Sequence, residues 1–320
     1  MKDIEELGVL IEKEIKQISY PITPELLYDP ICYIMELKGK RMRPILLLIA
    51  HQLFDEDISK AISPALAMEV FHNFTLLHDD IMDNAPLRRG TLTVHEKWNN
   101  NVAILSGDTM VVKAYQMMAD VNASIVKDVL NVFSKAATEV CEGQQLDMDF
   151  ETQNDVSLSD YMKMIEYKTA VLLAASLQIG GITAGADKKE QEHLYEFGKN
   201  IGIAFQLKDD LLDAFGNPDT FGKQLGGDIL TNKKTFLYLK GLQLADDVAK
   251  KKLQDYYTSD DSEGKISAVK EIFKSLDIEK HTLDMMKAYY TKAIKHLDAI
   301  DSNNKAPLIA FSESLMDRTS

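Results

Sequence analysis

Two sequence patterns are scarce in this chain of 320 residues: the alternation typical of β-strands and long uncharged apolar runs. Apolar residues instead recur at spacings of three and four, which indicates amphipathic helices. The longest apolar run, 170–186, has seventeen residues and is interrupted by polar side chains. A membrane span needs ~20 apolar residues. We therefore expect an all-α protein without a membrane span, in which 170–186 forms a buried central helix.

Cysteine and basic residues are also scarce. The two cysteines, Cys32 and Cys141, lie in apolar helical patterns without the spacing of a metal site, which is typical of a protein in a reducing compartment. The 36 basic residues are outnumbered by 50 acidic ones, and the net charge of −14 argues against a nucleic-acid partner. The first residues, MKDIEELGVL, lack the basic segment of a signal peptide. We expect a cytoplasmic protein.

Helical periodicity covers most of the chain. The predicted helices are 3–18, 23–37, 43–54, 59–83, 101–119, 123–147, 158–184, 188–214, 233–250, 264–298 (with a possible break near 276) and 305–317. Neither a low-complexity linker nor a solenoid repeat separates them, so residues 1–320 are expected to form a single large helical-bundle domain. The glycine-rich segment 215–232 is compatible with a mobile lid or with an ordinary flexible loop.

Three aspartates, Asp79, Asp80 and Asp83, follow one of these apolar helical runs. On a helix Asp79 and Asp83 lie 40° apart, so three carboxylates crowd a single helix end. At ~4 Å and an effective dielectric of about 20, each like-charge pair costs about 4 kcal/mol. A hard divalent cation removes that cost, and Mg²⁺ prefers one or two carboxylates together with phosphate oxygens.

A second copy of the pattern, FQLKDDLLD at 205–213, carries Asp209, Asp210 and Asp213. The other acidic pairs, Asp246-Asp247 and Asp260-Asp261, have no aspartate three residues further on, and we expect them to be solvated surface. The repetition favours a metal site over an ordinary acidic helix end.

Basic residues accompany the first acidic motif. Arg88 and Arg89 follow it, and their guanidinium groups are suited to bidentate phosphate contacts. Lys40, Arg41 and Arg43 precede an apolar helix opened by Pro44, where basic side chains and free backbone N–H groups could bind an anion. The alternative for this second group is a solvated basic turn. Together the acidic and basic groups predict a metal-diphosphate site.

In these motifs the chain resembles the trans-isoprenyl diphosphate synthases, the polyprenyl synthetase family. The matching segments, in the family's order, are GKRMRP at 39–44, LLHDDIMDNAPLRRG at 76–90, GQ at 143–144, YKT at 167–169, FQLKDDLLD at 205–213, GK at 222–223 and NKKT at 232–235. The resemblance implies an isoprenoid synthase-like helical bundle around a central catalytic cavity. It also implies a homodimer that condenses isopentenyl diphosphate with an allylic diphosphate (dimethylallyl, geranyl or farnesyl), using Mg²⁺ or Mn²⁺.

The resemblance also implies roles for individual residues. The metal ligands would be Asp79, Asp80, Asp83, Asp209, Asp210 and Asp213. Isopentenyl diphosphate would be bound by Lys40, Arg43, His72 and Arg89. The allylic diphosphate would be bound by Arg88, Lys168, Thr169, Gln206, Lys223 and Lys233, with Lys168, Thr169 and Gln206 also beside the cation that forms from it. In the family the released diphosphate takes the final proton, which agrees with the lack of a convincing Ser-His-Asp or Cys-His arrangement here.

The expected chain-length residues lie just before the first acidic motif. In related enzymes bulky side chains there form the floor of the product tunnel, and the corresponding residues are Phe71, Phe74 and Thr75. On an ideal helix Phe71 lies 80° and Phe74 140° from Asp79, so ordinary core packing is the alternative for Phe74. We expect a short product, C15 to C20.

Two other functions are compatible with parts of the sequence. A class I terpene cyclase also ionises a diphosphate at a DDxxD helix, but the second acidic motif, the RRG segment and the GKRMRP segment disfavour it. A non-catalytic subunit of a heteromeric prenyl synthase would be all-α as well. Such subunits have degenerate aspartate motifs, whereas both motifs are intact in this chain.

Overall fold

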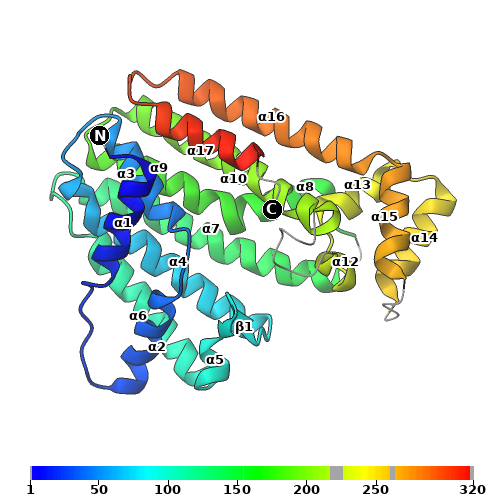
Figure 1. Ribbon diagram of the computed structural model, residues 1–320, viewed down its shortest axis with the longest axis horizontal. Coiled ribbons are helices and arrows are strands. Elements are labelled where there is room, and N and C mark those ends of the chain that lie inside the picture. The colour runs from blue at the N-terminus through cyan, green and yellow to red at the C-terminus, as the bar shows by residue number, and fades with distance from the viewer. Residues whose placement is uncertain (1, 154, 217–225, 260–263, 318–320) are drawn as a thin grey trace. The chain divides into compact units, whose positions relative to one another are not determined.

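The computed structural model describes residues 2–153, 155–216, 226–259 and 264–317. Contacts group the chain into two compact units. The first unit comprises Met1–Ser134, Ala175–Glu192 and Ser302–Pro307, and the second comprises Lys135–Ala174, His193–Asp301 and Leu308–Ser320. Nearly all regular structure in the described residues is helical (Figure 1), which confirms the all-α fold class. The single-domain expectation stays a prediction.

The first unit holds the helices that lead to the first acidic motif. They are α1 (Ile4–Ile15), α2 (Glu25–Glu36), α3 (Met42–Gln52), α4 (Ile62–Met82) with a 3₁₀ turn before it (Ile58–Ala61), α5 (Val94–Lys97) and α6 (Asn100–Met118). α1 begins with a capping box in which Asp3 and Glu6 satisfy each other's backbone N–H groups. α3 reads ILLLIA over 45–50, and these six residues are all buried. The core of this unit therefore forms around α3 and the apolar part of α4.

The second unit holds the helices that lead to and follow the second acidic motif. They are most of α7 (Val126–Thr152), α8 (Leu158–Ile165), a π-helical turn (η2, Glu166–Ala170), the start of α9 (Val171–Thr183), most of α10 (Lys188–Phe215), α12 (Gly227–Leu230), α13 (Phe236–Leu244), α14 (Asp247–Thr258), α15 (Lys265–Ser275), α16 (Ile278–Asp298) and most of α17 (Ala306–Asp317). Its core packs apolar residues of α10 against those of α13 and α15, among them Leu207, Leu211, Phe236 and Phe273.

Most predicted helices are confirmed, and one is wrong. The predicted helix 233–250 is two helices, because Ala245 is extended and Asp246 caps α14 by accepting a hydrogen bond from the Ala249 N–H at 2.8 Å. Asp246 and Asp247 are exposed, as expected, while Asp260 and Asp261 lie outside the described residues. The break near 276 is confirmed, because α15 ends at Ser275 and α16 begins at Ile278.

The run 170–186 was expected to be a buried helix rather than a membrane span. α9 covers most of it, and its side chains are buried along nearly the whole helix. In the part of the chain that the structure describes, no helix has the length and apolar character needed to cross a membrane.

The loop after the first acidic motif contains a two-stranded ribbon that the sequence did not predict. β1 (Leu87–Arg88) pairs antiparallel with β2 (Thr91–Leu92), so that Leu87 faces Leu92 and Arg88 faces Thr91. The two connecting residues, Arg89 and Gly90, have φ of 54° and 77°, as a type I′ hairpin turn requires. Neighbouring arginines therefore occupy different positions, Arg88 in a strand and Arg89 in the turn.

Candidate active site

The first acidic motif lies at the end of α4, where Arg88 closes over it. The Arg88 guanidinium donates to Asp80 Oδ1 through Nε at 2.8 Å and through Nη2 at 2.5 Å, and Nη2 also reaches Asp79 Oδ2 at 3.3 Å. Asp80 is buried, Asp79 is half-buried, and Asp83 is exposed just beyond the helix. One guanidinium thus neutralises the inner part of the motif.

Burial and the partner's charge have opposite effects on the pKa values of Asp80 and Arg88. Burial raises the pKa of Asp80, although the hydrogen bond and charge of Arg88 work against that rise. Burial lowers the pKa of Arg88, but Asp80 and Asp79 outweigh it, so that the pKa is raised overall. The two members of the pair therefore stabilise each other's charge against the effect of burial.

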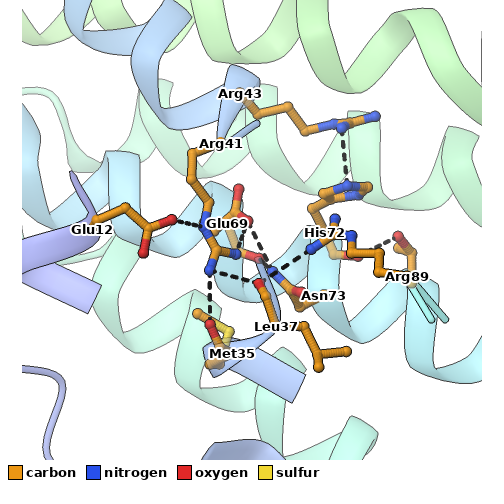
Figure 2. Close-up of polar contacts among 10 residues, drawn as sticks. Glu12, Met35, Leu37, Arg41, Arg43, Glu69, His72, Asn73 and Arg89 are labelled. Atoms are coloured by element: carbon orange, nitrogen blue, oxygen red, sulfur yellow. Dashed lines mark hydrogen bonds and ion pairs between the residues drawn. The ribbon is translucent and has the colours of Figure 1, made fainter. Parts of the chain in front are cut away.

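A basic cluster of Arg43, His72 and Arg89 lies near Arg88, whose charge also acts on His72 and Arg89. Arg43 Nη1 and His72 Nε2 are 3.1 Å apart, and Arg89 Nη1 donates to the Leu37 carbonyl at 3.3 Å (Figure 2). A Cβ added at Gly39 would lie 2.7 Å from Arg89 Nη1, so the Arg89 side chain lies against the loop that carries the exposed Lys40. Three of the four residues expected to bind isopentenyl diphosphate are thus close together, and the fourth lies beside them in sequence.

His72 is electrically neutral in this cluster. Burial lowers its pKa well below the ordinary value, and the charges of Arg43 and Arg89 lower it further. A neutral ring can accept the Arg43 hydrogen bond at Nε2, which places its proton on Nδ1. Burial also lowers the pKa of Arg43 to about 10, helped by Arg89, so Arg43 still carries its charge at neutral pH.

The second acidic motif lies near the end of α10 and has different partners. Tyr161 Oη donates a short hydrogen bond to Asp210 Oδ2, and Gln206 Nε2 donates to Asp210 Oδ1 at 3.2 Å. Burial raises the pKa of Asp210 to about 7, although the two hydrogen bonds oppose the rise. Asp209 and Asp213 are half-buried. The middle aspartate is therefore held by neutral groups.

Lys168 and Thr169 lie in the π-helical turn between α8 and α9, where one extra residue widens the helix. A Cβ added at Gly143 of α7 would lie 2.3 Å from the Lys168 backbone nitrogen, so only glycine permits this approach. The Lys168 ammonium binds Asp147 Oδ2 at 2.6 Å, and Thr169 Oγ1 donates to Gln206 Oε1 at 3.2 Å. The turn therefore connects α7 to the second acidic motif.

Asp213 connects the second motif to the segment that follows it. Its Oδ2 accepts the Asp228 N–H at 3.1 Å, and its carbonyl accepts the Gly226 N–H at 2.7 Å. The Lys233 ammonium is 4.0 Å from Asp228 Oδ1. Lys233 is thus near the second motif, and its role at the allylic diphosphate stays a prediction, while Lys223 lies outside the described residues.

The predicted chain-length residues form part of an aromatic cluster. The buried Phe71 packs against Phe74, with ring centroids 5.4 Å apart, and against Phe133 at 5.1 Å. Phe74 is half-buried and contacts the His78 ring at 4.7 Å. Thr75 Oγ1 donates to the His72 carbonyl at 2.7 Å. Their role in product length stays a prediction.

Four of the five non-glycine residues with positive φ in the described part of the chain neighbour candidate site residues in sequence, and the fifth, Asp277, precedes α16. Arg41, Asn84, Arg89 and Asn232 have φ between 45° and 59°, in the left-handed region that non-glycine residues seldom adopt. They are neighbours, in sequence, of Lys40, Asp83, Arg88 and Lys233. Such strain costs of order 1–3 kcal/mol per residue and tends to cluster at functional sites.

The acidic side chains fit a magnesium ion in their chemistry. Among the described residues, no three His, Cys, Asp or Glu side chains lie close enough to bind a metal by themselves. Mg²⁺ does not require such a group, because it is bound by one or two carboxylates and completes its shell with water and substrate phosphate oxygens. Asp79 and Asp83 in the first motif, and Asp209 in the second, each carry carboxylate oxygens suited to such a shell.

Several polar residues at these groups were missed by the sequence analysis. They are Glu69, which binds Arg41, together with Asp147, Tyr161 and Asp228. Asp147 follows Gln144 of the GQ segment by three residues, a helical spacing that could have revealed it. Tyr161 and Glu69 carry no comparable signal, because their partners are distant in sequence.

Comparisons with known proteins agree with this fold and these motifs. Geranylgeranyl diphosphate synthase of Methanosarcina mazei is 42% identical over 70% of each chain, and geranylfarnesyl diphosphate synthase of Natronomonas pharaonis is 36% identical over 92% of this chain and 91% of its own. A crystal structure of a geranylgeranyl pyrophosphate synthase is 45% identical, covers 100% of both chains and has a TM-score of 0.94.

The fold and the two acidic motifs define an all-α prenyltransferase. The chain belongs to the polyprenyl synthetase family, whose model it matches over residues 24–276. The family expected from the sequence motifs and the expected enzyme class are both confirmed.

Proposed function

We propose that this protein condenses isopentenyl diphosphate with an allylic diphosphate and releases diphosphate. The observation that carries the proposal is that the two neighbouring arginines of the hairpin have different partners. Arg88 contacts the first acidic motif, while Arg89 lies near Arg43 and His72. An arginine beside an acidic motif and an arginine beside other basic groups suit two diphosphate substrates, one bound with metal and one bound by basic groups alone.

Each group has a defined chemical task in this proposal. Lys40, Arg43, His72 and Arg89 bind and orient isopentenyl diphosphate. Arg88, Lys168, Lys223 and Lys233 bind the allylic diphosphate and neutralise the charge that develops on it. Aspartates of each motif would hold Mg²⁺, which would supply further neutralisation of the leaving group. Thr169 and Gln206 present hydroxyl and amide oxygens to the allylic cation, and the released diphosphate accepts the proton lost from the new chain.

We infer that the main product is the C20 diphosphate, within the short range expected from the sequence. The names of similar proteins support this length, since two of the three above are geranylgeranyl diphosphate synthases. On α4 each residue back from Asp79 adds ~1.5 Å of depth, so Phe74 lies ~7.5 Å and Phe71 ~12 Å below it. We propose that these two rings, with the small Thr75 beside them, limit the growing chain.

We also propose a cytoplasmic homodimer. α6 exposes three apolar side chains, Ile104, Leu105 and Val112, at 44%, 59% and 59% of their surface. Their spacing of one, seven and eight residues places them on one side of the helix, which suits a contact with a second copy. A reducing cytoplasm suits the two free thiols.

Turnover with radiolabelled isopentenyl diphosphate tests the reaction. We expect label to enter a longer acid-labile prenyl product only when an allylic diphosphate and Mg²⁺ are both present. Chromatography of the dephosphorylated products should give mainly C20 alcohol, and longer chains from soluble Phe74→Ala and Phe71→Ala variants. Cyclic hydrocarbons without incorporation of label would indicate a terpene cyclase, and absence of turnover without an added subunit would contradict the proposal.

A further inference from the structure

Arg41 is the one arginine of the GKRMRP segment to which the proposed reaction gives no substrate. Its side chain is buried, at 4% exposure, and four of its five N–H groups are used (Figure 2). Nε donates to Glu12 Oε1 at 2.8 Å and Nη1 to Glu69 Oε1 at 2.7 Å. Nη2 donates to the carbonyls of Met35 at 2.8 Å and Leu37 at 3.0 Å. A guanidinium with so many protein partners is poorly placed to bind a substrate.

These bonds fix the loop between α2 and α3, residues 37–40. The acceptors on Met35 and Leu37 lie at the end of α2, while the Arg41 carbonyl accepts the Ile45 N–H and so begins α3. Arg41 itself has φ of 45°, so its backbone holds a conformation that its side-chain bonds must maintain. Lys40 precedes this anchor by one residue, and Arg43 follows it by two.

The same loop also receives Arg89. The Leu37 carbonyl accepts hydrogen bonds from both Arg41 and Arg89, and the Arg89 side chain lies against Gly39. A displacement of the loop would therefore move Lys40 directly and remove the support of Arg89. Two of the four proposed ligands of isopentenyl diphosphate, Lys40 and Arg89, therefore depend on one buried side chain.

Glu69 is the buried anion that holds Arg41 in place. It lies on α4, three residues before His72, and is 2% exposed. Its Oε1 accepts from Arg41 and also from Asn73 Nδ2 at 3.0 Å, and Asn73 donates in addition to the Glu69 carbonyl. The charge of Glu69 also raises the pKa values of Arg43 and Arg89 against the effect of burial. Glu69 thus connects the helix that carries His72 to the loop that carries Lys40.

We propose that Arg41 and Glu69 form a positioning pair for the isopentenyl diphosphate site, holding Lys40, Arg43, His72 and Arg89 in one arrangement without touching the substrate. The inference rests on the proposed function and adds two residues to it. Lysine cannot reproduce the planar fork of Arg41, and glutamine keeps the volume and the acceptor oxygen of Glu69 while removing its charge.

Steady-state kinetics of Arg41→Lys, Glu69→Gln and the double variant test the pair. We expect Arg41→Lys to raise the KM for isopentenyl diphosphate roughly 10- to 100-fold, since misplacement by 1 Å can cost about 100-fold. Glu69→Gln should raise it less, and the double variant should resemble Arg41→Lys because the two residues act through one contact. The kcat and the KM for the allylic substrate should stay within about twofold, which a general loss of stability would not produce.

A matched control comes from the exposed pair Lys60–Asp55, whose atoms are 2.6 Å apart in the same unit. Lys60→Gln breaks an ion pair of similar length and should change neither KM. If Arg41→Lys is insoluble, Glu69→Gln carries the test alone. A lower KM for isopentenyl diphosphate in Glu69→Gln would make Glu69 a repelling charge and overturn the proposal, as would equal changes for both substrates or additive effects in the double variant.

The wild-type protein separates this inference from the proposed function. If it does not consume isopentenyl diphosphate with any allylic substrate, the proposed reaction is wrong. If it does so, and Lys40→Ala raises the KM for isopentenyl diphosphate while the Arg41 and Glu69 variants leave it unchanged, only the positioning pair is wrong.

Discussion

The two acidic motifs have the same spacing and differ in how their middle aspartate is held. Asp80 is buried against the Arg88 guanidinium, whereas Asp210 is buried against the hydroxyl of Tyr161 and the amide of Gln206. The first carboxylate has a counter-charge and the second has none among these partners. Identical motifs can therefore present different electrostatics to a metal, because the surrounding helices determine the partners.

This difference suggests a division of work between the motifs. Arg88 already compensates part of the charge of the first motif. The attraction between a metal cation and the middle aspartate, Asp80, is therefore weaker there. The attraction between a cation and Asp210, the middle aspartate of the second motif, is stronger, because its hydrogen-bond partners Tyr161 and Gln206 are neutral. Four predictions test this comparison, beginning with the largest expected effect.

Removing the first aspartate of either motif, Asp79 or Asp209, should abolish most turnover. Asp79→Ala and Asp209→Ala each remove a carboxylate expected to ligate Mg²⁺, and loss of such electrostatic stabilisation costs roughly 100-fold or more in kcat. Incorporation of radiolabel measures the loss, and circular dichroism checks that the helices remain. Turnover that survives both substitutions and a chelator would refute the metal mechanism.

The two neighbouring arginines should act on different substrates. Loss of a charge-assisted contact costs about 1.5–3 kcal/mol, or about 10- to 150-fold in an equilibrium constant. Arg89→Ala should therefore raise the KM for isopentenyl diphosphate, and Arg88→Ala that for the allylic substrate, because Arg88 contacts the first acidic motif while Arg89 contacts the loop that carries Lys40. Initial rates with each substrate varied in turn decide the matter. If both variants raise the KM for the same substrate only, the two arginines do not bind different substrates.

Neutralising the middle aspartates should affect stability unequally. Asp80→Asn removes the charge that Arg88 faces, and we expect a loss of about 1.5–3 kcal/mol in the free energy of unfolding. Asp210→Asn keeps an oxygen for Tyr161 and removes a costly buried charge, so the change should be below about 1 kcal/mol. Urea unfolding at pH 8 in the presence of a chelator measures the free energy of unfolding of both variants. Equal losses would contradict the proposed difference between the two motifs.

The second motif should also make stability depend on pH. The pKa of Asp210 is raised to about 7, above the value of an unfolded aspartate, so the folded protein holds this proton more tightly. Its contribution is complete below the unfolded pKa of ~3.9 and is lost as pH rises through 7, with a slope of up to about 1.4 kcal/mol per unit. Metal-free urea unfolding between pH 5 and 8 should show this decline, and Asp210→Asn should flatten it.

Sequence patterns predicted the helices well because an apolar face repeats every three or four residues wherever a helix is buried. They failed at 233–250, where α13 ends at Leu244 and Asp246 caps α14. A capping aspartate and a surface aspartate look alike in a sequence, since only the backbone around them differs. The β-ribbon was missed for a related reason, because four strand residues are too few for a periodic signal.

For the candidate site, the charged motifs were visible because their members are neighbours in the chain. The partners were not visible, because Tyr161 and Asp210 are 49 residues apart and Arg41 and Glu69 are 28 apart. Such contacts depend on how helices pack, which local spacing does not determine. The sequence therefore predicted which residues carry charge and left open which of them already neutralise one another.

The π-helical turn at Glu166–Ala170 has a consequence for the rotational phase of the helices around it. One additional residue in a helix shifts everything before it by about 100° relative to everything after it. The offset lets Tyr161 of α8 reach Asp210 while the apolar side chains that open α9 remain buried. A deletion of one residue here would restore a regular helix and turn Tyr161 away from its acceptor. The π-helical turn is a weaker piece of helix, and it joins two helices whose contact faces differ by about 100° in rotation. One face carries Tyr161, and the other carries the buried apolar side chains of α9.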